Sequence, residues 1–533
     1  MHEIITLQFG ELANYVGSHF WNIQQAYPAD DADPNAPQIP SQPVHHGVLF
    51  RSNGGGPDGQ SWTPRVLIYD LKPNFGSLCQ YTGAATTAAK PELTPTGGQQ
   101  RVLQGLARSY DAGGQRVAVH TQDPVTRSDY LRTLDSPLSA PTTTPQPSTS
   151  TAHGDLANDV RYWSDYGETY YHPGAFYPNF STLSVNGALN DFADYQQGQE
   201  LFRTQWKQGE LNEDALRRCV EEADTLQGFQ ILANTLDGFG GYASAYLEYL
   251  QDEYAKEPIL TFGIAEGTGQ SYSDRQRLNQ LLALRGLAGD SDHGVHLPLQ
   301  MPDLASLRAF GWTAEPTRHT NFKYLGGAVL AAFVDTLTLP CRTGQTALHS
   351  LVRHLEGSQR CGILAGLQSF PSPVVEWPGA DQSIRDVVER GTLQDVSVFQ
   401  GPPSRTSATS KEILLSAMQI NRREAVHGTA GTSDTARFDL PVPLPLPGSF
   451  PAMFRAASSV NSKATATDEL PTLDGLAVAA ARTSQAQWFG DSARWLRQQT
   501  NTGATHHQDR DELLELREFL EDLDQRYTVY DNM

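Results

Sequence analysis

Short apolar runs alternate with segments of helical spacing along the first half of the chain. Residues 4–9 are largely apolar and end at Gly10, after which apolar residues recur every three or four positions as far as Ile23. This pattern predicts a strand, a tight turn and an amphipathic helix. We predict a second strand over residues 65–70 and a buried parallel strand over 259–264. Strands followed by helices in this order are typical of an α/β nucleotide-binding architecture.

Helical spacing dominates the segments between these strands. Residues 190–252 have the apolar pattern of helices, interrupted by the glycine-rich stretch 237–241, and further helices are predicted over 275–290 and 324–337. The apolar stretch around the last of these carries Asp335 and is shorter than the ~20 residues that span a bilayer. We therefore expect it to be a buried helix of a soluble protein.

The last amphipathic segment lies close to the C-terminus. Over residues 509–527 the leucines recur at alternating steps of three and four, and the other faces of the predicted helix are strongly acidic. Two interpretations stay open. The helix packs on its own domain with a solvated acidic face, or it docks onto a partner protein.

These patterns and the composition of the chain suggest three regions. Residues 1–345 form an α/β, Rossmann-type domain with a parallel sheet, 346–465 form an α+β domain, and 466–533 form a C-terminal helical region. Residues 136–151 are almost wholly Ser, Thr, Pro, Ala and Gln, a composition that cannot offset its ordering entropy by burial. We interpret them as a disordered insertion inside the first domain.

Composition and charge exclude several classes of protein. The 533 residues carry a net charge of −21, which opposes binding to phosphate backbones and to anionic lipid. The four cysteines are far apart, without the spacing of a zinc site or a disulfide framework. No Lys or Arg precedes Arg51, so we expect no cleavable mitochondrial import signal. A direct nucleic-acid partner, a transmembrane segment and a bound metal are thus not expected.

Two separated blocks of sequence resemble tubulin. Residues 1–17, followed by Phe20 and Trp21, resemble the tubulin N-terminus without a gap, and residues 223–230 resemble the tubulin segment that leads into its glycine-rich phosphate loop. Closer still is the Misato family of tubulin-like proteins. The residues that carry this similarity are found in four places: 64–72, 163–166, 170–173, and Pro445-Leu446-Pro447 before Ser449-Phe450-Pro451. The resemblance covers most of residues 1–345 and, more loosely, the remainder.

The resemblance implies both a fold and a biological process. It implies a tubulin-like fold and, from the fungal members of the Misato family, a role in mitochondrial partitioning and mitochondrial DNA inheritance. We expect protein partners, either cytoskeletal or chaperonin, and peripheral association with mitochondria on the cytosolic side, with the cytoplasm as the alternative location. Two other functions remain alternatives: a GTP-binding, filament-forming cytoskeletal GTPase, and a cytosolic factor associated with tubulin or chaperonin.

In the tubulin fold, backbone N–H groups of glycine-rich turns at helix N-termini hold the phosphates. The resemblance implies two such turns here, one formed by Gly10, Glu11 and Leu12 and one that contains Gly238, Gly240 and Gly241. Bulky Phe239 and Tyr242 interrupt the second turn, and Asp237 and Glu11 place carboxylates beside the phosphate position. These carboxylates would repel a nucleoside triphosphate unless a Mg²⁺ intervened. We expect a degenerate nucleotide site without a cofactor, with GTP as the alternative ligand.

Three further residues belong to this predicted site. Asp70 ends the second strand, and Lys72 lies where tubulins have an acidic residue, so that it could contact phosphate or pair with Glu11, or be an ordinary solvated lysine. Asn279 could match the asparagine that reads guanine, although a helix-surface amide is the alternative. We predict no catalytic residues, because no hydrolase motif or legible nucleophile is present.

The most informative departure from tubulin concerns hydrolysis. Tubulins complete the GTPase site of the neighbouring subunit with an acidic residue in a loop, where it positions the attacking water. The corresponding residues here are 342–351, and no Asp or Glu occurs between Asp335 and Glu356. His349 is the only candidate base in that loop. The resemblance therefore predicts a protein without tubulin-style GTP hydrolysis.

Overall fold

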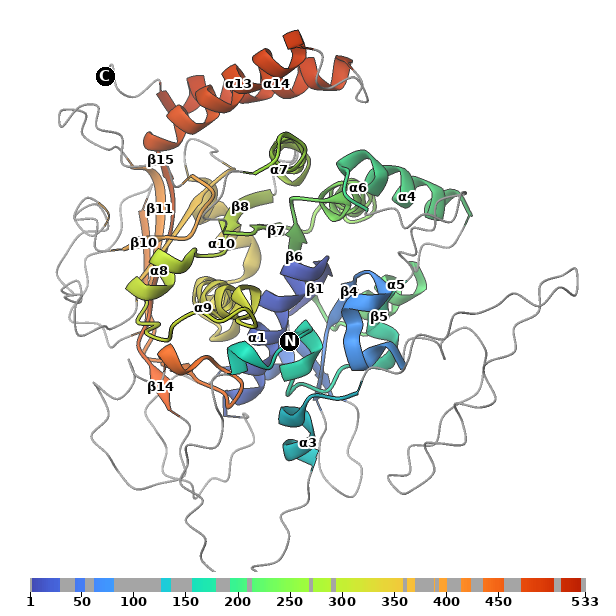
Figure 1. The fold of residues 1–533 in the computed structure, drawn as a ribbon, viewed down its shortest axis with the longest axis vertical. Coiled ribbons are helices and arrows are strands. Elements are labelled where there is room, and N and C mark those ends of the chain that lie inside the picture. Colours follow the sequence, from blue (N-terminus) through green and yellow to red (C-terminus); the bar gives the residue numbers. More distant parts are fainter. Residues whose placement is uncertain are drawn as a thin grey trace, which may run out of the picture.

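The fold was analysed in a computed structural model of the chain, coloured from the N-terminus to the C-terminus in Figure 1. The predicted insertion at 136–151 lies outside the described residues. The structure describes residues 2–28, 44–52, 62–80, 126–135, 156–178, 192–208, 213–267, 272–288, 294–357, 362–369, 388, 393–399, 414–422, 435–454, 471–502 and 510–528.

A six-stranded parallel sheet forms the centre of the first half of the chain. Its order is β5-β4-β1-β6-β7-β8, and every neighbouring pair is parallel. The predicted strands at 4–9, 65–70 and 259–264 are confirmed as β1, β4 and β7, and with them the α/β class. The strands are β1 (Glu3–Phe9), β4 (Val66–Tyr69), β5 (Phe176–Tyr177), β6 (Leu226–Asn234), β7 (Ile259–Ala265) and β8 (Gly294–Gln300).

Helices cover both faces of this sheet (Figure 1). Helices α1 (Glu11–Ala26) and α9 (Phe322–Arg342) pack together on one face. Helices α4 (Tyr195–Gln208), α6 (Gly238–Glu253) and α7 (Asp274–Ala288) pack together on the other. The strand order reverses direction between β1 and β6, and open α/β sheets place their ligands at the carboxyl ends of the strands beside such a reversal.

The prediction of continuous helix over 190–236 is wrong for its last part. Residues Leu226–Asn234 form strand β6 between β1 and β7, and seven of its nine residues are buried. A strand that is covered on both faces is a nearly continuous apolar run, which short-range periodicity cannot distinguish from a buried helix. The remainder of the predicted helical region contains α4 and α5 (Glu213–Glu221).

The second sheet has five strands in the order β10-β9-β15-β11-β12. Only β11 and β12 are parallel; the other neighbouring pairs are antiparallel. Strand β15 lies at the centre although it comes after residue 465, so the sheet draws strands from both sides of the predicted domain boundary. The strands are β9 (Ala365–Ser369), β10 (Gln394–Asp395), β11 (Leu414–Asn421), β12 (Thr435–Asp439) and β15 (Leu476–Arg482).

Helix α9 joins the two halves of the structure. It contacts α1 on one side and strands β11 and β15 of the second sheet on the other. Among the described residues it is the one helix long and apolar enough to cross a membrane, and that window is fully buried within the protein. The prediction of a buried helix is confirmed.

The chain ends in a helical hairpin of α13 (Ser484–Thr502) and α14 (Arg510–Thr528), which lies across the top of Figure 1. The predicted stripe is buried against the rest of the protein, and Tyr527 donates a hydrogen bond to the carbonyl of Ile363 (2.5 Å). The packing interpretation is therefore confirmed, while partner docking remains a prediction. The stripe consists of Leu513, Leu516, Leu520, Leu523 and Tyr527.

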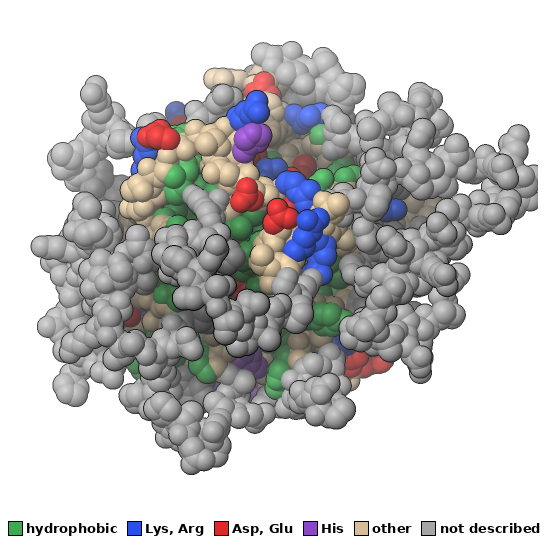
Figure 2. Space-filling view, turned by 60° about the horizontal axis from the view of Figure 1, so that its bottom comes forward, with side chains coloured by type: hydrophobic (Ala, Val, Ile, Leu, Met, Phe, Trp, Pro, Cys, Tyr) green, Lys and Arg blue, Asp and Glu red, His purple; other side chains and the backbone are tan. Residues whose placement is uncertain are grey.

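The remaining described elements are short. They include α3 (Asp129–Asp135), α8 (Leu304–Ala309) and α10 (Leu348–Glu356), and two small hairpins, β2 (Phe50–Ser52) with β3 (Trp62–Pro64) and β13 (Leu444–Pro445) with β14 (Thr472–Leu473). Figure 2 shows one face of the molecule, where acidic and basic side chains lie beside one another.

Candidate functional site

The two predicted phosphate turns lie together at the carboxyl edge of the parallel sheet. Gly10 follows β1, Asp70 follows β4, and Asp237 follows β6 and is the N-cap of α6. These are the strand ends at which an open α/β sheet places its ligands. The structure therefore brings together the glycine turns and the acidic residues that the sequence assigned to one site.

The ring of Phe239 fills the space next to Gly10. Gly10 has φ of +89°, and a methyl group added to its Cα would lie 2.9 Å from the Phe239 ring. Phe239 is 2% exposed and packs edge-to-face on Phe192, with 4.9 Å between the ring centroids. A phenyl side chain thus separates the two turns where the tubulin resemblance expects backbone facing phosphate.

The first N–H groups of α6 are already bonded within the protein. The N–H of Gly238 donates to the carbonyl of Phe192 (2.9 Å), and that of Phe239 donates to the Asp237 carboxylate (2.9 Å). The N–H of Gly240 donates to the carbonyl of Asp237 (3.2 Å). These are the orphan donors that hold an anion at a helix N-terminus. In this chain they are satisfied by a neighbouring loop and by the cap residue.

The glycines of α6 are required for packing against α4. A Cβ atom on Gly241 would lie 1.8 Å from the carbonyl oxygen of Tyr195. In the opposite direction, a Cβ atom on Gly198 would lie 1.7 Å from the carbonyl oxygen of Gly238. The two helices therefore cross at backbone contact, which only glycine permits. This close crossing gives a structural reason for glycine at position 241.

Glu11 pairs with Lys323 of α9. The Lys323 ammonium lies 2.6 Å from the Glu11 carboxylate, and both side chains are about one-third exposed. Lys72 lies on the surface, in the 3₁₀ segment Lys72–Gln80. Burial lowers the pKa of Lys323, but Glu11 outweighs burial, so the pKa is raised overall. This lysine comes from the start of α9, a position that the sequence pattern did not indicate.

Asp70 is fully buried and accepts four hydrogen bonds. The donors are the Asn14 amide (2.8 Å), the Trp163 indole (3.0 Å), the Asn74 amide (2.8 Å) and the N–H of Leu71 (2.8 Å). Burial raises the pKa of Asp70 to about 7, against the effect of the Asn74 and Asn14 bonds. This carboxyl joins α1 to two loops and has no exposed surface towards a ligand.

Burial also raises the pKa of Asp237 to about 7, and its neighbours Asp70 and Glu11 contribute in the same direction. The Asp237 carboxylate accepts hydrogen bonds from the N–H of Phe239 and from the Asn234 amide (2.5 Å). Three carboxyl groups therefore influence one another at this edge of the sheet, with Lys323 as their cation. Among the described residues, no group of three or more His, Cys, Asp or Glu side chains is arranged to hold a metal ion.

Asn279 is buried, and backbone groups occupy its amide. Its NH₂ group donates to the carbonyls of Ala193 (2.6 Å) and Leu236 (2.9 Å), and its oxygen accepts from the N–H of Tyr195 (3.1 Å). The helix-surface alternative is wrong, because Asn279 is only 1% exposed. Leu12, from the first turn, is likewise buried in the core.

The loop that carries the catalytic acid in tubulins lies at the opposite edge of the sheet. It connects α9 to α10, and the first N–H of α10, at Leu348, donates to the Gln227 side chain at the start of β6 (2.8 Å). Position 344 is a glycine with φ of +71°. The loop and the helix turns on either side of it contain no carboxylate.

The sequence interpretation missed Asn14, Phe192 and Lys323 as residues of this site. Phe192, which has an unusual positive φ of 46°, and Lys323 come from segments without a recognisable motif, whereas Asn14 lies within the tubulin-like N-terminal block. Trp163 was visible as part of a Misato-like run, although its bond to Asp70 was not. Tertiary contacts supply these neighbours, so no short pattern indicates them.

Comparison with known proteins assigns the chain that forms this site to a family. A family model described as the Misato Segment II tubulin-like domain matches residues 2–136, and one described as a tubulin domain matches residues 154–343. The chain belongs to the Misato family of tubulin-like proteins. Together the two matches cover the α/β half, including both glycine turns.

Relatives in this family have about 30% identity. Protein dml1 of Aspergillus niger is 30% identical over 344 residues, 64% of this chain and 62% of the relative. Protein DML1 of Phaeosphaeria nodorum is 34% identical over 348 residues, 64% of this chain and 59% of the relative. Protein misato homolog 1 of Pongo pygmaeus is 29% identical over 416 residues, 71% and 68% respectively. The match thus spans less than two thirds of both fungal relatives.

Proposed function

We propose that this Misato-family chain is a non-catalytic, tubulin-like protein that acts through protein partners in the partitioning of mitochondria and in mitochondrial DNA inheritance. Family membership supports the tubulin-like half of the proposal. The process comes from the resemblance to fungal Misato proteins, since a fold alone does not carry a function.

The observation that carries the non-catalytic half is the Phe239 side chain against Gly10. A triphosphate needs close approach of backbone N–H groups at two turns. Here the buried Phe239 ring fills the space that phosphate would need next to Gly10. The first N–H groups of α6 are already bonded to Asp237 and to the Phe192 carbonyl. The carboxyl groups of Glu11 and Asp237 add repulsion towards phosphate. We infer that this conformation does not fit a nucleoside triphosphate.

The α9–α10 loop supports the same proposal independently. The tubulin resemblance implies that a loop at the amino edge of one subunit's sheet would complete the site at the carboxyl edge of the neighbouring subunit's sheet. The loop lies at that amino edge, yet no Asp or Glu occurs between Asp335 and Glu356. A neighbouring copy would therefore receive no carboxylate to position an attacking water.

GTP turnover and GTP-dependent pelleting of the purified full chain test the proposal. We expect neither phosphate release nor pelleting from the wild type, and no change in either for Glu11→Ala. GTP-dependent pelleting or phosphate release that Glu11→Ala alters would contradict the proposal and favour the filament-forming GTPase.

A second variant tests whether the phenyl ring blocks binding. Phe239→Ala removes the ring, and we expect nucleotide binding to stay undetectable or to appear weakly, without turnover. Phe454→Ala, which removes another buried ring in the segment after β13, controls for general loss of packing. Tight GTP binding by the wild type, abolished by neither variant, would show that the ring does not close the site.

The proposed location is the cytosolic side of mitochondria. Cell fractionation followed by protease treatment of intact mitochondria tests it. We expect the chain to be digested without detergent. A protease-resistant pool that becomes sensitive only after detergent would place the protein inside the organelle and overturn this part of the proposal, whereas a purely cytosolic pool would favour a tubulin- or chaperonin-associated factor.

A further inference from the structure

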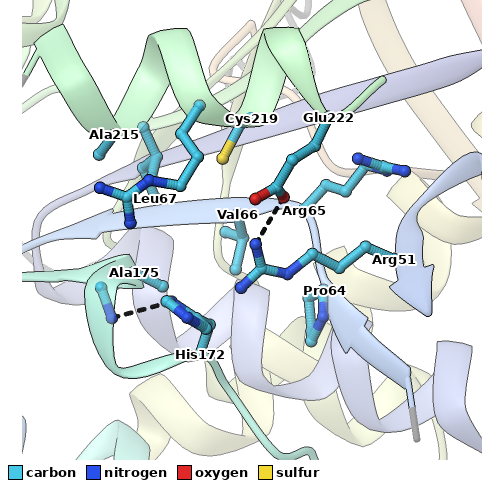
Figure 3. A pocket seen from close by; sticks show the side chains of 12 residues that line it. Arg51, Pro64, Arg65, Val66, Leu67, His172, Ala175, Ala215, Cys219 and Glu222 are labelled. Carbon is cyan, nitrogen blue, oxygen red and sulfur yellow. Dashed lines mark hydrogen bonds and ion pairs between the residues drawn. The ribbon is translucent and has the colours of Figure 1, made fainter. Parts of the chain in front are cut away.

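A second concave site lies at the amino end of β4, the end opposite Asp70. Its wall is formed by α5, by the start of β4 and by the turn before β5 (Figure 3). The hollow measures about 360 Å³ including its open mouth, and oxygen-sized atoms can place their centres within about 20 Å³ of it. The space suits one small ion, and it is too small to enclose a nucleoside.

Positive charge dominates the lining of this hollow. Three arginines from three different elements, Arg51 of β2, Arg65 before β4 and Arg218 of α5, line it together with His172. Among the described lining residues Glu222 alone is acidic, and the Arg51 guanidinium binds it at 2.6 Å. Two cationic charges are left without a lining carboxylate, in a chain whose net charge is −21.

Arg65 shows the excess of positive charge in the lining most clearly. Its side chain is buried, with 8% of the residue exposed, and neither Nε nor Nη1 has a hydrogen-bond partner among the described residues. Proteins normally pair or neutralise a buried cation, because removing its hydration shell without providing a partner is unfavourable. Two of the three guanidinium nitrogens of Arg65 therefore lack a hydrogen-bond acceptor among the described residues.

His172 adds a neutral donor. Its Nδ1 accepts a hydrogen bond from the N–H of Gly174 (3.1 Å), which leaves the proton of the neutral ring on Nε2. Burial lowers the pKa of His172, and Arg51 and Arg218 lower it further, so the ring is neutral at pH 7. In Figure 3, Cys219 lies beside Glu222, and His172 lies below it, near the Arg51 side chain. The polar lining thus consists almost entirely of donors.

We propose that this hollow, defined by Arg51, Arg65, Arg218 and His172, is a binding site for a phosphate-type oxyanion, either the free ion or the phosphate group of a small ester. Guanidinium groups match phosphate through paired N–H bonds, and a dianion balances the two uncompensated charges. The site lies at the other edge of the sheet from the degenerate nucleotide site, so it is independent of whether that site binds GTP.

Titration calorimetry on the full chain, at constant ionic strength set with chloride, tests the proposal. We expect saturable binding of inorganic phosphate to one site. Arg218→Gln, at an exposed position on α5, should weaken it roughly tenfold, which corresponds to the loss of a charge-assisted hydrogen bond. Glu222→Gln should instead tighten binding, because it frees Arg51 from its internal carboxylate.

Arg217→Gln is the matched control. Arg217 is the neighbour of Arg218 on α5, it pairs with Glu221 and it does not line the hollow. The control should bind phosphate as the wild type does. Equal weakening by Arg217→Gln and Arg218→Gln would show non-specific attraction and overturn the proposal, as would the absence of saturable binding in the wild type.

Two further arms complete the test. Titration with phenyl phosphate distinguishes the two possible ligands, the free phosphate ion and a phosphate ester. Equal affinity indicates the free ion, and tighter binding indicates an ester whose organic part extends out of the open mouth of the hollow. In urea denaturation, phosphate should raise the unfolding midpoint of the wild type and not that of Arg65→Met. The same rise in Arg65→Met would exclude this buried guanidinium from the site.

Discussion

At the scale of single residues, the same side chain can serve phosphate binding or packing, and the tertiary contacts decide which. Gly10 needs its positive φ of +89°, as a phosphate turn also would. Gly241, in contrast, is needed because any side chain there would clash with the Tyr195 carbonyl of α4. Asn279 forms hydrogen bonds with three backbone groups. Residue types at motif positions therefore do not by themselves distinguish a nucleotide site from packed protein.

The buried histidines give a prediction at this scale. His296 is fully buried beside Thr261, and burial lowers its pKa to about 3. The unfolded chain takes up this proton near pH 6.5 and the folded chain does not, so stability is present in full above pH 6.5 and is lost as pH falls. Between pH 6 and pH 5 the wild type should lose ~1 kcal/mol of unfolding free energy relative to His296→Gln in urea titrations.

The His296→Gln variant keeps a polar group next to Thr261 without a titrating ring, so the comparison isolates the proton. A stability difference between the two proteins that stays constant from pH 6 to pH 5 would mean that His296 binds protons equally in the folded and unfolded states. Stability below pH 5 is less informative, because many carboxyl groups titrate there as well.

At the scale of elements, the pattern predicted strands β1, β4 and β7 and helices α1, α7, α9 and α14. It failed at β6, because a strand flanked by β1 and β7 and covered by helices on both faces has no polar side. Its identity depends on pairing partners that are more than 200 residues away on the β1 side. Short-range periodicity carries no information about such partners.

Helix α14 offers a prediction with a control on the same element. Leu516 is fully buried, whereas Leu514 is 38% exposed on the other face. Leu516→Ala should lower the unfolding free energy by about 2–5 kcal/mol and Leu514→Ala by less than about 0.5 kcal/mol, measured by urea denaturation. Loss of a co-purifying partner with Leu514→Ala, at unchanged stability, would support docking by the outer face.

At the scale of the whole molecule, a buried ionic network holds the two sheets together through α9. Asp335 accepts hydrogen bonds from Gln24 (2.6 Å) and Tyr27 (2.8 Å) of the α1 region and pairs with Arg342 (2.8 Å) and Arg422. Burial alone raises the pKa of Asp335, but the two arginines outweigh it and lower that pKa. The carboxylate is therefore the common partner of α1, α9 and the end of β11.

Removing this charge should destabilise the entire fold. Asp335→Asn leaves Arg342 and Arg422 buried without a counter-charge, and we expect a loss of about 3–5 kcal/mol in the free energy of unfolding. Asp522→Asn, which removes an exposed partner of Arg526 on α14, should cost less than about 1 kcal/mol. Similar losses in chemical denaturation for the two variants would show that the buried network does not stabilise the contact between the sheets.

The sequence by itself determined the α/β class, the first strand and helix, the family resemblance and the absence of a carboxylate between Asp335 and Glu356. Local periodicity and residue identity are enough for these. Only the tertiary structure decided that Phe239 lies against Gly10, that Lys323 pairs with Glu11 and that three arginines line one hollow at the amino end of β4. Such contacts join segments far apart in the chain, and their geometry follows from how the core packs.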